Sequence, residues 1–248
     1  MFILSILFFI TAILYSSVGF GGGSTYLALL LIWNIPFYIF PLLALICNII
    51  VVTGNCFNYI RAGNHNFKLL TPFLIGSVPL AFIGGTLEIS KEIFEILLFL
   101  VLTIAGVLLL INNKAYQEKN FKVTKLKPFL YTLIGSILGL ISGIVGIGGG
   151  IFLSPILFLL KIEKPKNIAT SASLFILINS ISGVLGQLTK QTVINEILIY
   201  WPLFFGVLVG GLVGNFLNIK IFRNRVLAIL TSLLVIFVSV RVGIKIFF

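Results

Sequence analysis

Two glycine clusters, Gly-Phe-Gly-Gly-Gly at residues 19–23 and Gly-Ile-Gly-Gly-Gly at residues 146–150, interrupt long apolar runs of the chain. The runs that hold them, 1–33 and 128–160, would each be about 50 Å long as a single helix. The hydrocarbon core of a membrane is only about 30 Å thick. Each glycine in a row weakens a helix by about 1 kcal/mol relative to alanine. We therefore expect each run to form two shorter helices joined at a glycine break.

The composition places these runs in a lipid bilayer. Hydrophobic residues make up 59% of the 248 residues and charged residues only 9%, and the mean hydropathy is +1.21. Soluble domains carry about 25% charged residues. This excludes a cytosolic enzyme, a disordered tail and a nucleic-acid-binding domain, and it leaves a polytopic membrane protein. Such a protein is expected to be all-α, because a backbone exposed to lipid must satisfy its own hydrogen bonds.

The uncharged runs predict about eight hydrophobic segments. The first run, 2–60, is too long for one helix, and we divide it near 34–41, where Pro36 and Pro41 interrupt helical continuity. The expected segments are 1–33, 38–60, 69–87, 96–113, 128–160, 167–189, 197–219 and 226–240.

The chain contains an internal duplication. The two glycine clusters are 127 residues apart, and the spacing P-x3-G-x7-G recurs at an offset of 130. The second pattern is Pro72, Gly76 and Gly84 in the first copy and Pro202, Gly206 and Gly214 in the second. Many transporters are built from two such halves, with the substrate at their interface. We predict two transmembrane repeats, 1–112 and 128–248, joined by a basic loop at 113–127.

The basic residues predict the orientation of the halves. If each glycine-broken run is a hairpin or re-entrant loop that returns to its starting side, one side of the membrane collects 13 of the 17 Lys and Arg, and the other collects 4. Cytoplasmic loops carry an excess of Lys and Arg. We therefore expect inverted halves, with both termini outside and loop 113–127 in the cytoplasm.

The glycine breaks predict an anion site. A helix that starts after a break presents N–H groups without intrahelical partners and carries about half a positive charge. Glycine lets a ligand approach that backbone closely, so a small anion can bind without a buried Lys or Arg. The expected new helices begin at Ser24-Thr25 and at 151–152. The candidate binding residues in the two breaks are Gly19, Gly21, Gly22, Gly23, Ser24, Thr25, Gly146, Gly148, Gly149 and Gly150.

Polar residues that follow each cluster complete the candidate site. In the first half the candidate is Asn48, and in the second half the candidates are Thr170, Ser171, Ser173 and Asn179. We expect Thr170–Ser173 to form a hydroxyl cluster at a helix start. Such side chains can donate to an oxyanion, or they can simply bridge helices, and the sequence leaves both roles open.

The residue counts exclude several chemistries. The chain has one His, and all six of its acidic residues are Glu located outside the apolar runs. No Ser-His-Asp triad, clustered histidine metal site or embedded carboxylate relay is therefore expected. A nucleotide-binding loop is also missing. We expect a protein that is not an enzyme and that has no cofactor or metal. Coupling to sodium and simple facilitated flux both remain open.

The glycine clusters also resemble a known family. The stretches 19–23 and 146–157, together with Asn58–Gly63, the Pro72–Pro79 motif and Ala169-Thr170-Ser171, are similar to the signature of the TauE/SafE (TSUP) family of sulfite and sulfonate exporters. The resemblance covers nearly the whole chain. It implies an inner-membrane transporter of small anions such as sulfite, sulfoacetate or other organosulfonates.

Two departures from that signature indicate unequal half-sites. Pro155 follows only the second cluster, and the first half has no clear counterpart of Thr170-Ser171. The alternatives are a passive anion channel on the same scaffold, a carrier for a non-sulfur organic anion, and a membrane subunit without transport of its own. An intramembrane enzyme is disfavoured because no His lies in an apolar run. A homo-oligomer is left open.

Overall fold

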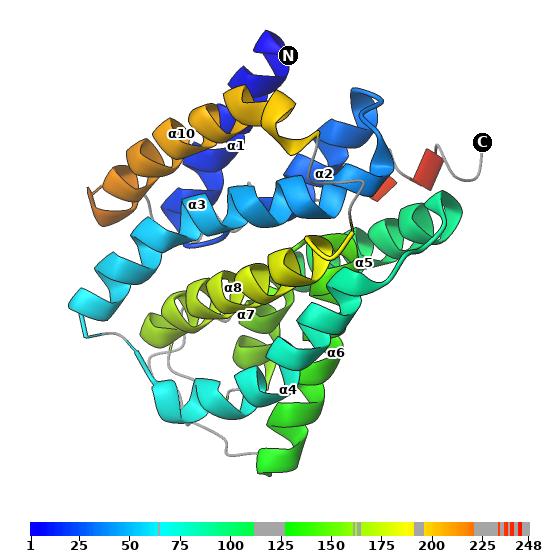
Figure 1. The fold of residues 1–248 in the computed structure, drawn as a ribbon. Helices are drawn as coiled ribbons and strands as arrows, with labels where there is room; N and C mark the ends of the chain where they lie inside the picture. The colour runs from blue at the N-terminus through cyan, green and yellow to red at the C-terminus, as the bar shows by residue number, and fades with distance from the viewer. Residues whose placement is uncertain are drawn as a thin grey trace.

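A computed structural model describes residues 1–63, 65–111, 127–160, 162, 165–190 and 196–220, together with 233, 236–237, 239–240 and 243–244. These residues form a helical bundle (Figure 1). Its elements are α1 (Phe2–Val18), α2 (Gly23–Ile32), η1 (Phe37–Ile39), α3 (Phe40–Arg61), α4 (Phe67–Thr86), α5 (Lys91–Ile111), α6 (Pro128–Val145), α7 (Gly150–Leu159), α8 (Pro165–Gln187), η3 (Ile197–Tyr200) and α10 (Trp201–Lys220).

Several of these helices are suited to a membrane. Five are long and apolar enough to span one: Phe37–Arg61, Phe67–Thr86, Pro128–Val145, Asn167–Gln187 and Ile197–Leu217. Helices Phe2–Ser17 and Gly23–Ile32 are apolar but shorter. The predicted all-α membrane architecture is therefore confirmed. The predicted loop 113–127, except residue 127, and most of the segment 226–240 lie outside the described residues.

The first glycine break turns the chain back on itself. Helix α1 ends at Gly19, whose φ of 86° is left-handed, and the N–H groups of Gly19 and Phe20 return to the last turn of α1. Beyond the break, the Tyr26 ring stacks on Phe8 of α1 with ring centroids 4.7 Å apart. Since residue 26 lies beside residue 8, α2 runs back along α1 as the shorter arm of a hairpin.

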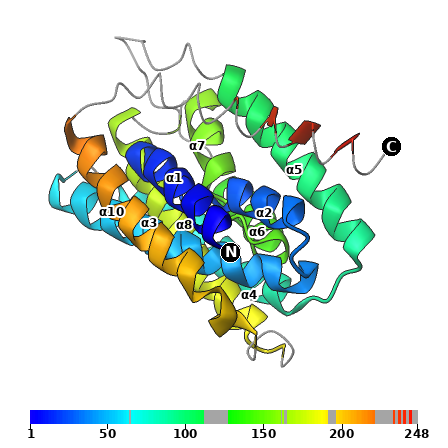
Figure 2. The same ribbon diagram turned by 90° about the horizontal axis from the view of Figure 1, so that it is seen from above.

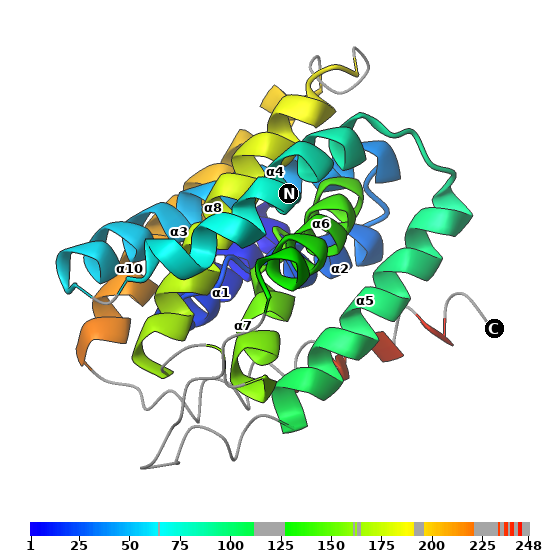
Figure 3. The ribbon, with the colours of Figure 1, turned by 90° about the horizontal axis from the view of Figure 1, so that it is seen from below.

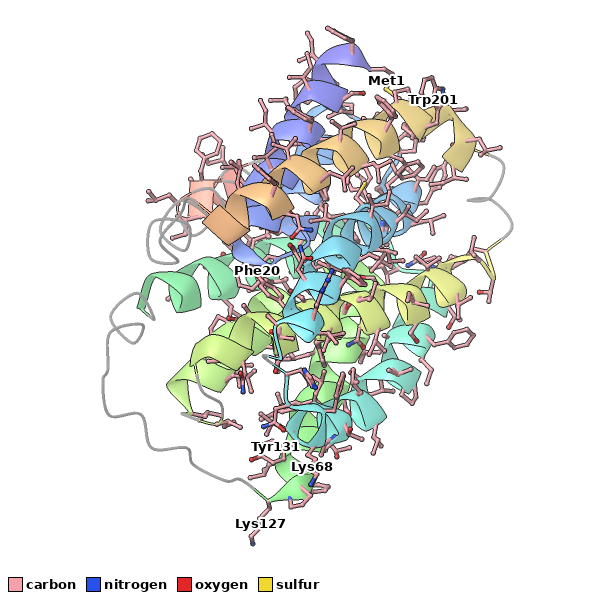
Figure 4. The ribbon with its side chains drawn as sticks, turned by 90° about the vertical axis from the view of Figure 1, so that its left-hand side faces the viewer. Met1, Phe20, Lys68, Lys127, Tyr131 and Trp201 are labelled. Carbon is pink, nitrogen blue, oxygen red and sulfur yellow. The ribbon has the colours of Figure 1, made fainter. Side chains whose placement is uncertain are left out.

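Two hydrogen bonds between distant segments define one end of the bundle. The Tyr38 hydroxyl donates to Glu196 Oε2 at 2.7 Å, and Lys190 Nζ donates to the Leu87 carbonyl at 2.6 Å. We call this the Trp201 end, because α10 starts there at Trp201. Figure 4 shows Met1 beside Trp201 at this end, Lys68 and Lys127 at the opposite end, and Phe20 of the first break between them. We call the opposite end the Lys127 end.

The two hairpins enter from opposite ends of the bundle. In the first hairpin, α1 starts at the Trp201 end and α2 returns to that same end. Helix α6 starts at Lys127, and α7 leads into α8, which finishes near Lys190. Helix α7 therefore returns to the Lys127 end. Helices α3 and α8 lie together in the middle of the bundle, while α5 is peripheral (Figure 2, Figure 3).

The glycines of the P-x3-G-x7-G pattern hold two parallel helix pairs together. A Cβ atom at Gly76 or Gly84 of α4 would overlap the carbonyl oxygens of Thr132 and Leu140 on α6. On α10, Gly206 and Gly214 meet the carbonyl oxygens of Ser5 and Ile13 on α1 in the same way. The glycines differ by 130 in number and their partner carbonyls by 127, so both offsets of the sequence repeat recur in the contacts. Small residues permit this close approach of membrane helices.

Candidate functional site

Asn48 on α3 connects the two glycine breaks. Its side chain is completely buried. Its Nδ2 donates to the Ile147 carbonyl at 3.1 Å and to the Gly146 carbonyl at 3.4 Å, both in the second break. Its Oδ1 has no hydrogen-bond partner. One amide from the first half is thus fixed by the second half, with a free acceptor left inside the protein.

Glycines from both breaks surround this amide. A Cβ atom at Gly21 would overlap Asn48 Oδ1, while a Cβ at Gly23 or Gly148 would lie 2.7 Å or 3.0 Å from Asn48 Nδ2. A Cβ at Gly23 would also lie 3.0 Å from the Ile147 carbonyl oxygen. The two breaks therefore pack directly against each other around Asn48. We call Gly21, Gly23, Asn48, Ile147 and Gly148 the glycine junction.

The backbone of the breaks requires glycine for a second reason. Gly22 has a φ of 89°, Gly148 of 82° and Gly149 of 74°. These left-handed conformations cost an ordinary residue roughly 1–2 kcal/mol. The sequence prediction of two breaks at these clusters is therefore confirmed in position. The new helices begin one residue earlier than expected, at Gly23 and Gly150.

The starts of α2 and α7 supply hydrogen-bond donors near the junction. Bonding within α2 begins with the N–H groups of Thr25 and Tyr26, which both donate to the Gly22 carbonyl. In α7, the N–H groups of Phe152 and Leu153 donate to the Gly149 carbonyl in the same way. The N–H groups of the residues just before them precede the first intrahelical bond, and they carry the positive end of the helix dipole.

The hydroxyls of the first break belong to a small network. The Tyr15 hydroxyl lies 2.7 Å from Thr25 Oγ1 and 3.2 Å from Ser24 Oγ. Across the halves, the Ser173 hydroxyl of α8 donates to the Gly19 carbonyl at 2.6 Å. Ser24 and Thr25 thus lie at the start of α2, and Ser173 reaches the first break from α8, a contact that the sequence did not predict. Sequence reasoning missed Tyr15, although Tyr15-Ser16-Ser17 is a polar triplet immediately before the cluster.

The remaining polar candidates lie along α8. Thr170, Ser171 and Asn179 are buried, and Thr170 Oγ1 and Asn179 Oδ1 have no hydrogen-bond partner. The predicted hydroxyl cluster at a helix start is wrong, because α8 begins at Pro165. Proline suits the first turn of a helix, where its missing N–H costs no bond, so Thr170 falls in the second turn.

Ser180 is a further polar group beside the second break. A Cβ atom at Gly148 would lie 3.0 Å from Ser180 Oγ, and this hydroxyl is buried without a hydrogen-bond partner. Sequence analysis did not select Ser180, because it is one of many serines in α8. Its role can be recognised only from the three-dimensional structure. Each break has a buried polar side chain from the next long helix beside it: Asn48 lies beside Gly21, and Ser180 lies beside Gly148.

The cations of the described chain stand away from this junction. Each Lys and Arg of the described ranges lies at a helix end or in a loop, as Arg61, Lys68, Lys91, Lys127 and Lys190 illustrate. An anion at the glycine junction would be held by N–H groups, amides and hydroxyls. In the part of the chain that the structure describes, no group of three His, Cys, Asp or Glu side chains could hold a metal ion.

Comparisons with known proteins agree with the helical membrane architecture. The family described as "Sulfite exporter TauE/SafE" matches residues 4–242. A probable membrane transporter protein of Sinorhizobium fredii is 25% identical over 233 residues, which cover 93% of each chain. A probable membrane transporter protein of Methanocaldococcus jannaschii is 31% identical over 199 residues, which cover 77% of this chain and 73% of the relative. No solved structure matches this chain.

Proposed function

Because this chain belongs to the TauE/SafE family of sulfite exporters, and is therefore a multi-pass membrane transporter, we propose that it carries small sulfur-containing anions. Sulfite, sulfoacetate and other organosulfonates are the substrates that the resemblance implies. The observation that carries the proposal is the direct packing of the two glycine breaks, each followed by a helix start, around the buried Asn48 amide.

The proposed site is the glycine junction, with the two helix starts on either side. Negative sulfur-bound oxygens would accept from backbone N–H groups at the starts of α2 and α7. Ser180, whose buried hydroxyl is unpaired, would add a donor, and Thr170, Ser171, Ser173 and Asn179 would form its wall on α8. Leaving a buried polar group unsatisfied costs about 1–3 kcal/mol. An anion that accepts from the Ser180 hydroxyl would remove that cost at Ser180.

We propose further that the two repeats, 1–112 and 128–248, are inverted and together make about eight segments. Two features support this: the hairpins enter from opposite ends, and the glycine contacts of α4–α6 recur in α1–α10 at the sequence offsets. Arg61, Lys68 and Lys127 gather at the Lys127 end. The positive-inside rule would put this end, with loop 113–127, in the cytoplasm, and the family resemblance implies a location in the inner membrane.

The second candidate is a passive anion channel on the same scaffold. It is favoured by the position of the carboxylates, because all six Glu lie outside the apolar runs and none is placed for an embedded proton relay. A carrier for a non-sulfur organic anion would use the same junction.

The test is counterflow in proteoliposomes that contain the purified protein. Labelled sulfite is added outside vesicles loaded with sulfite, sulfoacetate, other sulfonates, sulfate or chloride. Transient accumulation driven by sulfite or sulfonates, and not by chloride, would support a carrier for sulfur oxyanions. Flux that never accumulates label above equilibrium would favour the channel. No exchange with any of these anions, from protein shown to be folded, would contradict the proposed substrate.

A further inference from the structure

A cavity of about 560 Å³ opens at the Trp201 end, beside the glycine junction. It lies between the start of α3, the α4–α5 connection and the end of α6, and Gln187, Lys190 and Glu196 complete its wall. Its size is that of a small-molecule site, for which about 300–1,000 Å³ is usual. Most of its wall is apolar, and its charged groups are Lys190, Glu88 and Glu196.

The inner wall of this cavity touches the second glycine break. Pro41 and Ile144 line the cavity. A Cβ atom at Gly146 would lie 2.6 Å from Pro41 Cα, so this proline lies between the cavity and the break. Gln187 also lines the cavity, and its Nε2 donates to the Gly143 carbonyl at 3.1 Å, one turn before the break. The cavity and the glycine junction are thus separated by a thin layer of residues.

The ammonium of Lys190 is held in the cavity wall with one N–H to spare. Nζ donates to the Leu87 carbonyl at 2.6 Å and to Gln187 Oε1 at 3.2 Å, and both acceptors are neutral. A lysine ammonium has three N–H donors, so these two bonds leave a third for another partner. Burial of this side chain lowers the pKa of Lys190, and the nearby Glu88 opposes that effect. A partly desolvated cation gains from an anionic partner.

The carboxylates of the cavity make such binding weak. Glu196 accepts from the Tyr38 hydroxyl, and Glu88 is close enough to affect Lys190. An anion at Lys190 is therefore attracted by one charge and repelled by two. A transport pathway benefits from this balance, because a permeating ion must be attracted enough to enter and held loosely enough to leave.

From this arrangement we infer that the cavity is the vestibule through which anions exchange between the Trp201 end and the glycine junction, with Lys190 as their docking cation. The inference rests on the proposed anion transport and adds its entry route. It gives Lys190 a role in capturing the substrate and none in the inner site. It also predicts opposite effects on substrate affinity when the positive charge of Lys190 and the negative charge of Glu196 are removed.

Counterflow kinetics test the opposite signs. We expect Lys190→Gln to raise the KM for sulfite about fivefold, which is the size of one unit charge acting across a few ångströms of a water-like medium, with little change in maximal rate. Lys190→Arg should keep most of the affinity, and Glu196→Gln should lower the KM. Unchanged KM values in Lys190→Gln and Glu196→Gln, with wild-type exchange intact, would overturn the vestibule.

Thiol labelling tests the vestibule without requiring transport. Ile89 lines the cavity and is half-buried, while the native Cys47 and Cys56 are buried and give a quiet background. In an Ile89→Cys variant, we expect Lys190→Gln to lower the rate of reaction with a sulfonate-bearing methanethiosulfonate, relative to a cationic one, about fivefold. An unchanged ratio would overturn the role of Lys190. If the ratio falls but the wild type exchanges no anion, Lys190 attracts anions to the cavity as inferred, and the proposed function is what fails.

Discussion

The two glycine breaks share a sequence pattern and a hairpin shape, but they differ in backbone and in surroundings. The first break has left-handed glycines at Gly19 and Gly22, whereas the second has them at Gly146, Gly148 and Gly149. The second break is thus the more tightly specified turn. At its C-cap, Gly146 packs on the backbone of Pro41, while Gly19 at the same place meets the side chains of Tyr59 and Ser173.

The side chains around the two breaks also differ, being more polar at the first break than at the second. Hydroxyls of Tyr15, Ser24 and Thr25 form a network at the first break. The second break is enclosed mainly by Phe175 and Ile176, and it offers two backbone carbonyls to Asn48. The comparison teaches that a duplicated motif preserves the turn, while the polar groups next to it diverge. We interpret the second break as the rigid frame and the first as the more polar half of one site.

The largest expected effect comes from the rigid frame. Gly148→Ala places a side chain in a left-handed conformation and against Asn48 and Ser180, so we expect transport to be lost. Gly63→Ala is the matched control, because Gly63 has a φ of 72° but nothing within 4 Å of an added Cβ. It should lower stability by about 1 kcal/mol and keep its flux. Both are read by counterflow and by thermal unfolding in detergent. Equal flux in the two variants would show that the packing around Gly148 has no part in transport.

The second effect, by size, concerns the amide between the breaks. Asn48→Leu removes the donor to Ile147 and Gly146 and leaves these carbonyls unpaired, at about 1–3 kcal/mol. We expect flux to fall tenfold or more. Asn58→Leu is the control on the same helix, because Asn58 also bonds across the halves, to Asn215 at 2.9 Å, near the Lys127 end. If Asn58→Leu impairs exchange as strongly as Asn48→Leu, loss of bonding between the halves explains both, and the junction loses its special role.

A smaller effect is expected at the link between α8 and the first break. Ser173→Ala deletes the bond to the Gly19 carbonyl, and Ser182→Ala deletes a bond of the same kind and the same 2.6 Å length to the Val78 carbonyl. Each loss is about 1 kcal/mol of stability. We expect only Ser173→Ala to slow sulfite exchange, by about fivefold. The opposite ranking of the two serines would place the functional contact on α4.

The smallest effect is expected at Tyr15. Tyr15→Phe removes the hydroxyl that Ser24 and Thr25 share but keeps the ring in place. The two freed hydroxyls remain able to bond to each other or to an anion, so we expect at most a twofold change in KM for sulfite. A larger change would show that the hydroxyl network itself contributes to sulfite binding.

Much of the fold could be predicted because membrane folding reduces to hydropathy and helix interruption. In the described part of the chain the apolar runs identified the helices, and Pro36 and the two clusters identified their interruptions, where Asn34 and several of the break glycines adopt positive φ. The sequence predicted the positions of helix starts less accurately. Thr170 was expected at a start because polar residues follow a charged loop there, but Pro165 begins the helix five residues earlier.

The candidate site was only partly predictable for a different reason. The glycines could be identified because a run of glycines in an apolar segment itself indicates a break in the helix. The roles of Asn48 and Ser180 depend on which helices pack against the glycine breaks. The hydrophobic periodicity of the sequence does not reveal which helices are neighbours. Tyr15 was missed because a tyrosine in an apolar helix usually only packs, and its bonds to Ser24 and Thr25 appear only after the chain turns back.

The central claim is that the two breaks form one anion site, and binding stoichiometry tests it most directly. Labelled sulfite, or a sulfonate that competes with it, is titrated against the purified protein in detergent by equilibrium dialysis. We expect one anion per chain, and we expect binding to be lost when either Gly21 or Gly148 is replaced by alanine. Two anions per chain, with each substitution removing one of them, would contradict a shared site.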